Sequence, residues 1–98
     1  MEQTERITLM EQRLNRALAA VRQLETALEA FAAAREDVKA LEGYYGSEEW
    51  KQDYHDDEAG RLPSDLPRGV LSEDAVWNLL ADCRELNIKM LEVVASSL

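Results

Sequence analysis

Apolar residues recur every three or four positions along the N-terminal half of the chain. They form the N-terminal seam, which consists of Ile7, Met10, Leu14, Ala17, Val21, Leu24, Leu28, Phe31 and Val38, with Arg35 as its one interruption. This spacing places the seam on one face of an α-helix and matches the heptad repeat of a coiled coil. Gly and Pro are absent between about residues 4 and 42, so one helix is predicted there, with Gly43 just past its end.

A second helical pattern follows Ser72 and predicts a helix over about residues 73–96. Ser72 is a favourable N-cap, and Leu71 and Val76 occupy the two positions of a hydrophobic staple. The apolar face of this helix consists of Val76, Leu79, Cys83, Leu86, Met90 and Val93.

The connector between these helices, residues 43–71, has a different composition. The stretch Tyr44–Trp77 holds five of the six aromatic residues, both prolines and three of the four glycines. A short helix is predicted over 48–58, with Ser47 as its N-cap and Gly60 at its end, and the following residues are rich in turn formers. The sequence therefore predicts an all-α fold, in which one domain over residues 1–98 forms an antiparallel helical hairpin closed by an ordered aromatic connector.

The two long helices of this hairpin differ in length. A C-terminal helix folded back from near Glu42 reaches only to about residues 17–18, because each residue adds 1.5 Å. Ile7, Met10 and Leu14 are then left without a cover from their own chain. We expect these three residues to mediate self-association, most simply as a homodimer; a frayed N-terminal end is the alternative.

Charge is concentrated in the connector. The net charge of the chain is −9, and residues 47–58 contribute −5 of it, from six acids against Lys51. Without a basic stripe, direct binding to nucleic acid or to anionic membranes is not expected. A second hypothesis is therefore an acidic decoy or inhibitor that offers this helix to a basic protein partner. Its candidate partner-binding residues are Glu49, Asp53, Asp56, Asp57, Trp50 and Tyr54.

The aromatic residues of this region, Tyr44, Tyr45, Trp50, Tyr54 and Trp77, allow two interpretations. They could anchor a partner, or they could form a small core that pins the connector to the mouth of the hairpin. We prefer the core, because Trp77 also lies beside the apolar face of the last helix. Arg61 and Arg68 are expected to pair with the local acids.

Catalytic, metal-binding and cofactor-binding patterns are not found. His55 lies off the helix face that carries Glu49 and Asp53, so it adds at most one partner, Glu58, to a metal site. Cys83, the one cysteine, falls on an apolar helix face, where a thiol usually packs as a small hydrophobe. We expect a non-enzymatic protein without cofactor or metal.

The cellular setting follows from the same composition. One cysteine permits no internal disulfide, which fits a reducing cytoplasm. No apolar run approaches the roughly 20 residues of a membrane span, and the first residues lack a signal-peptide pattern. We therefore expect a cytoplasmic protein.

The connector motifs carry a resemblance to a known family. The runs 44–50, 53–54, 58–63 and 68–74 (YYGSEEW, DY, EAGRLP and RGVLSED) resemble the bacterial domain-of-unknown-function family DUF4298, and the likeness covers nearly the whole chain. The resemblance implies a small, standalone, mostly helical bacterial protein without an established activity. It brings no catalytic or ligand-binding residues.

A third hypothesis is a small secreted helical hairpin of the WXG type, suggested by size and architecture. The pattern is incomplete, because Gln52 stands where that motif has Gly. The Tyr54-x-x-x-Glu58 pair, which resembles a secretion signal, also lies in the middle of the chain.

Overall fold

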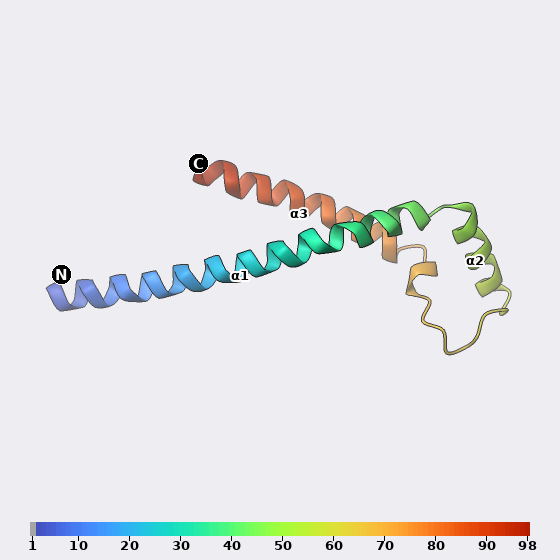
Figure 1. The fold of residues 1–98 in the computed structure, drawn as a ribbon, viewed down its shortest axis with the longest axis horizontal. Coiled ribbons are helices and arrows are strands. Elements are labelled where there is room, and N and C mark those ends of the chain that lie inside the picture. Colours follow the sequence, from blue (N-terminus) through green and yellow to red (C-terminus); the bar gives the residue numbers. More distant parts are fainter. Residues whose placement is uncertain (1) are drawn as a thin grey trace. The chain divides into compact units, whose positions relative to one another are not determined.

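The protein is built from helices, as the hydrophobic pattern predicts. In the computed structural model, which describes residues 2–98, the order is α1 (Gln3–Tyr44), α2 (Glu48–Glu58), the 3-10 helix η1 (Gly69–Leu71) and α3 (Ala75–Ser97) (Figure 1). No strand occurs in this part of the chain. The prediction of an all-α fold with a long N-terminal helix, a short second helix and a C-terminal helix is confirmed.

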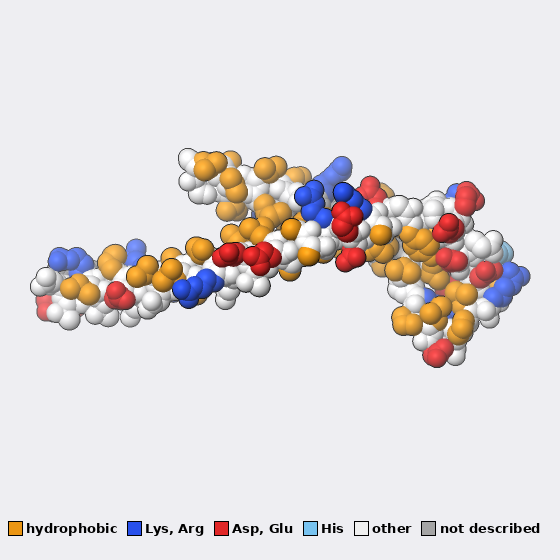
Figure 2. All heavy atoms as spheres, viewed as in Figure 1, with side chains coloured by type: hydrophobic (Ala, Val, Ile, Leu, Met, Phe, Trp, Pro, Cys, Tyr) orange, Lys and Arg blue, Asp and Glu red, His pale blue; other side chains and the backbone are white. Residues whose placement is uncertain are grey.

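The chain divides into two compact units. Unit 1 extends to Arg35 and consists of the first part of α1 alone, whereas unit 2, Glu36–Leu98, holds the end of α1, the connector and α3. All residues from 2 to 30 are exposed, because unit 1 contains no second element to cover its helix. Hydrophobic side chains accordingly lie at the surface along α1 (Figure 2).

The end of α1 differs from the prediction. Gly43, expected just past the helix, lies inside it, and the Tyr45 N–H still donates to the Leu41 carbonyl at 2.9 Å. The left-handed residue is Gly46, with φ +79°. The expectation was wrong because a glycine within a helix costs only about 1 kcal/mol relative to alanine, so its presence does not force an end.

Helix α2 begins and ends at the predicted residues. Ser47 is its N-cap, and its Oγ accepts a hydrogen bond from the Trp50 N–H at 3.1 Å. At the other end Gly60 has φ +71° and donates to the Asp57 carbonyl at 3.0 Å, while Arg61 N–H donates to the Asp56 carbonyl at 2.9 Å. This pair of bonds is a Schellman motif, which satisfies the last carbonyls of the helix.

Helix α3 begins at Ala75, two residues later than predicted, because residues 73–74 form a turn. Ser72 still acts as a cap: its Oγ accepts from the Ala75 N–H at 3.1 Å and donates to the Gly69 carbonyl at 2.9 Å. The preceding η1 helix was not predicted. Leu71 and Val76, the predicted staple pair, are the two buried hydrophobic residues in the described part of the chain, at 6% and 3% exposure.

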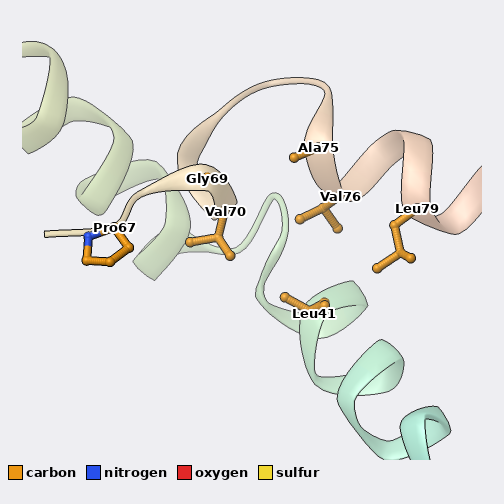
Figure 3. A pocket seen from close by; sticks show the side chains of 7 residues that line it. All are labelled: Leu41, Pro67, Gly69, Val70, Ala75, Val76 and Leu79. Atoms are coloured by element: carbon orange, nitrogen blue, oxygen red, sulfur yellow. The ribbon is translucent and has the colours of Figure 1, made fainter. Parts of the chain in front are cut away.

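Within unit 2 the connector brings the end of α1 to the start of α3. Leu41 of α1 lies with Val70, Val76 and Leu79 around a shallow apolar groove (Figure 3). This end of unit 2 is the closed end of the predicted hairpin. It is also where the small core sits, because both buried residues are here.

Candidate interaction surfaces

Large apolar residues of the N-terminal seam lie exposed along unit 1. Ile7, Met10 and Leu14, the residues predicted to mediate self-association, are 55%, 52% and 51% exposed. Neighbouring large apolar residues on the same helix are exposed as well, namely Leu9, Leu18, Val21, Leu24 and Leu28. The exposed face is therefore longer than the three residues that the length argument singled out.

An aromatic cluster organises the connector. The Trp50 ring stacks on Tyr54 and meets Tyr45 edge-on, each at a centroid distance of 5.2 Å. Trp50 Nε1 also donates to the Val70 carbonyl at 2.9 Å. These contacts join α2 to the segment that contains η1, so the Trp50 side chain fixes the position of η1 relative to α2.

Two tyrosines connect this cluster by hydrogen bonds to the turn before α3. Tyr45 Oη donates to the Glu73 carbonyl at 2.9 Å, and Tyr54 Oη donates to Glu73 Oε1 at 3.0 Å. Trp77 does not join the cluster, because its side chain is 64% exposed on α3. The expectation of one core containing all five aromatics is therefore wrong for Trp77, which lies exposed two residues beyond the start of α3.

Three of the four predicted acidic partner-binding residues bond within the chain. Asp53 Oδ2 accepts from Tyr44 Oη at 2.5 Å. Asp56 Oδ1 accepts from Gln52 and from Arg61, both at 3.1 Å. Asp57 accepts from Arg68, whereas Glu49 lies exposed on α2. The predicted pairing of both arginines with local acids is confirmed, and it reduces the acidic charge that this helix presents.

Arg68 holds the turn-rich part of the connector in place. Its Nη1 donates to Asp57 Oδ1 at 2.5 Å, its Nη2 to the Pro63 carbonyl at 2.9 Å and its Nε to the Leu66 carbonyl at 3.3 Å. Both charged side chains of this pair are about two-thirds or more buried, at 32% and 24% exposure. Charge-assisted hydrogen bonds of this kind are stronger than neutral ones. Sequence reasoning anticipated the ion pair but not the two carbonyl contacts, which no spacing rule reveals.

The hydrogen bonds of α2 shift three proton equilibria. The bond to Asp53, with smaller contributions from burial and from the charges of Asp53 and Glu49, raises the pKa of Tyr44 to about 12. The bond to Glu73, followed by the nearby charge of Glu58, raises the pKa of Tyr54. Bonds from Gln52 and then Arg61 lower the pKa of Asp56. In each case the hydrogen bond favours the protonation state that it requires, the neutral phenol of Tyr44 and Tyr54 and the ionised carboxylate of Asp56.

The groove of unit 2 offers no chemistry of its own. It has a volume of about 350 Å³ and is lined by Leu41, Pro67, Gly69, Val70, Ala75, Val76 and Leu79. None of these side chains ionises or carries a nucleophile. The groove is thus an apolar depression over the small core.

Other candidate chemistry is sparse in residues 2–98. No three His, Cys, Asp or Glu side chains come together there as a metal site would require. His55 is exposed on α2, and Cys83 is a half-buried free thiol on α3. None of the helices described combines the length and the apolar character needed to cross a membrane.

Comparison with known proteins gives one match. The family model described as "Domain of unknown function (DUF4298)" matches residues 7–93, which includes the seam, the connector and most of α3. No curated protein and no solved structure matches the chain significantly.

Proposed function

Because that match covers most of its length, the chain belongs to the DUF4298 family, and we propose that it is a non-enzymatic interaction module that self-associates through the N-terminal seam. The expected assembly is a homodimer with a coiled-coil contact along α1. Neither a cofactor nor a metal takes part in this function.

The observation that carries the proposal is the exposed apolar face of unit 1. In proteins, most of the stability of a helix comes from packing its apolar face against another element. Unit 1 holds no such element, and its seam residues Ile7, Met10 and Leu14 are each about half exposed. A second copy of the chain supplies the missing surface.

The size of the exposed face supports the proposal. Six large apolar residues of the seam are 44–63% exposed, namely Ile7, Met10, Leu14, Val21, Leu24 and Leu28. Burying the exposed half of each contributes on the order of 10 kcal/mol per chain, at 1.5–3 kcal/mol for a fully buried side chain. Two chains together contribute a free energy comparable to the roughly 4–15 kcal/mol that association costs.

The connector supports this function indirectly. Its aromatic rings and three of its acids already bond within unit 2, so it is better suited to fixing the turn between α1 and α3 than to recruiting a partner. The acidic decoy hypothesis depends on the remaining exposed acids, Glu48, Glu49 and Glu58. Binding of that kind weakens steeply with salt, whereas apolar self-association does not.

We place this function in the cytoplasm. Cys83 is a free thiol, which suits a reducing compartment.

The experiment compares two double substitutions that add the same charge. Met10→Glu with Leu14→Glu places two carboxylates in the seam, where burial of a charge is strongly unfavourable. Gln12→Glu with Asn15→Glu places them between the seam positions, on the outer face of the same helix turns. Sedimentation velocity should show monomers for the first variant and wild-type dimers for the second. Equal behaviour of the two variants would contradict a role for the seam.

A further inference from the structure

We infer that two copies of α1 pair antiparallel, crossing between Val21 and Leu24, so that the N-terminal half of each helix lies along the C-terminal half of the other. This inference rests on the proposed self-association and adds its direction and register. The occupant of the exposed face of unit 1 is therefore a second copy of this chain, in one orientation.

Charge is distributed unevenly along α1. Residues 6–22 carry four arginines against Glu11, a net charge of +3, and residues 23–42 carry five acids against Arg35 and Lys39, a net charge of −3. All of these residues are exposed. A parallel pair would place like-charged halves side by side, whereas an antiparallel pair places the basic half of each helix along the acidic half of the other. Complementary potentials of this kind fix orientation.

Arg35 gives a second, independent reason. In a parallel, in-register pair every seam residue faces its own copy, so two Arg35 side chains would meet in the apolar seam. Like charges removed from water in this way are strongly unfavourable. When Val21 lies level with Leu24 of the second copy, counting outward brings Arg35 level with Met10 and one residue from Glu11 of the second copy. The one charged position in the seam then faces Met10, with an acid in the adjacent position, and not a second arginine.

The sizes of the seam residues favour the same register. Counting outward from Val21 and Leu24 brings Ala17 level with Leu28, and Leu14 level with Phe31, of the second copy. A parallel pair would instead place Ala17 against Ala17 and Phe31 against Phe31. Alternation of small and large side chains fills an interface at the density of a protein interior, whereas small against small leaves a void.

The test is a pair of distance measurements by electron spin resonance. Cys83→Ser removes the native thiol, and Thr8→Cys or Gln23→Cys then supplies one labelled site on the exposed surface of α1. In the antiparallel register the two labels at position 8 are 29 residues apart along the helices, about 45 Å at 1.5 Å per residue. The two labels at position 23 are level, and with helix axes 8–10 Å apart they lie within about 30 Å of each other.

Each outcome has a separate meaning. A long distance at position 8 with a short one at position 23 is the expected result. Short distances at both positions mean a parallel dimer, and a short distance at position 8 with a long one at position 23 means pairing through the N-terminal ends only; either overturns the inference and leaves self-association intact. Absence of an intermolecular signal at both positions, with a monomeric mass, contradicts the proposed function itself. Circular dichroism of the labelled chains checks that α1 is retained.

Discussion

Unit 1 and the connector of unit 2 are stabilised in different ways. Unit 1 is a single helix whose seam is exposed, and its ordered form depends on helix propensity and on whatever covers that face. The connector has few buried side chains, but specific bonds from Trp50, Tyr54 and Arg68 define its shape. A helix pattern can be kept by many sequences, whereas a bonded turn needs particular residues at particular places. We therefore propose that the connector sets the geometry of the turn and that unit 1 provides the surface for association.

The largest expected effect is a difference between the two regions in how amide hydrogen exchange depends on protein concentration. Amide hydrogen exchange should slow at least about 10-fold in residues 7–30 when the protein concentration is raised through the dissociation constant, because the dimer is favoured by mass action. Amides of α2, whose bonds lie within one chain, should change less than about 2-fold. Mass spectrometry of peptides from both regions measures this difference. Equal concentration dependence in the two regions would remove the distinction between them.

The next effect concerns the ion pair of the connector. Arg68→Ala removes the bonds to Asp57, Pro63 and Leu66, and the free energy of unfolding should fall by about 2 kcal/mol, as for bonds to a partly buried charged group. Arg61→Ala is the matched control, because the Arg61 side chain is 64% exposed and such pairs contribute about 0–1 kcal/mol. Urea unfolding followed by tryptophan fluorescence gives both values. A larger loss for Arg61→Ala would contradict the role assigned to Arg68.

Two glycines at the end of α1 should respond in opposite directions. Gly46→Ala forces a side chain into a left-handed conformation at φ +79° and should cost about 1–2 kcal/mol. Gly43 lies inside the helix, and no atom is in the way of a new Cβ. Gly43→Ala should therefore stabilise the protein by about 0.5–1 kcal/mol. Thermal unfolding of the two variants measures the difference. Stabilisation by both substitutions would mean that α1 does not end at Tyr44.

The smallest expected effect is a loss of stability at alkaline pH. Folding raises the pKa of Tyr44 from 10.0 to about 12, so the folded state holds this proton more tightly than the unfolded state does. The resulting stability is fully present below pH 10 and is lost as the pH rises from 10 toward 12. Tyr44→Phe should remove that part of the pH dependence, and titration of tyrosinate absorbance should lose its highest-pH component. An unchanged titration would show that the Tyr44–Asp53 bond does not form in solution.

The sequence predicted those features that depend on local pattern. The three α-helices and the Ser47 cap follow from residue type and spacing. Leu71 and Val76 are buried, as expected of apolar residues at this place, but α3 begins later than the predicted staple requires. Gly43 was misassigned as the end of α1, because residue type alone does not say which of two nearby glycines adopts positive φ. The start of α3 was placed early for a similar reason, since Ser72 caps a turn before the helix proper.

Features that depend on contacts between distant residues could not be predicted from the sequence as well. The bonds from Trp50 to Val70 and from Tyr54 to Glu73 join residues 20 and 19 positions apart, and no periodicity reports such pairs. The expectation that connector aromatics serve structure was nevertheless supported for Tyr45, Trp50 and Tyr54. The exposed position of Trp77 could not be inferred, because its place beside the apolar face of α3 suggests burial equally well.

The most direct test of the account is the mass of the wild-type chain in solution, measured by sedimentation equilibrium from nanomolar to millimolar concentration. We expect a reversible increase from 11.1 kDa to twice that value as the concentration rises. A mass of 11.1 kDa throughout this range, with α1 fully helical by circular dichroism, would contradict it.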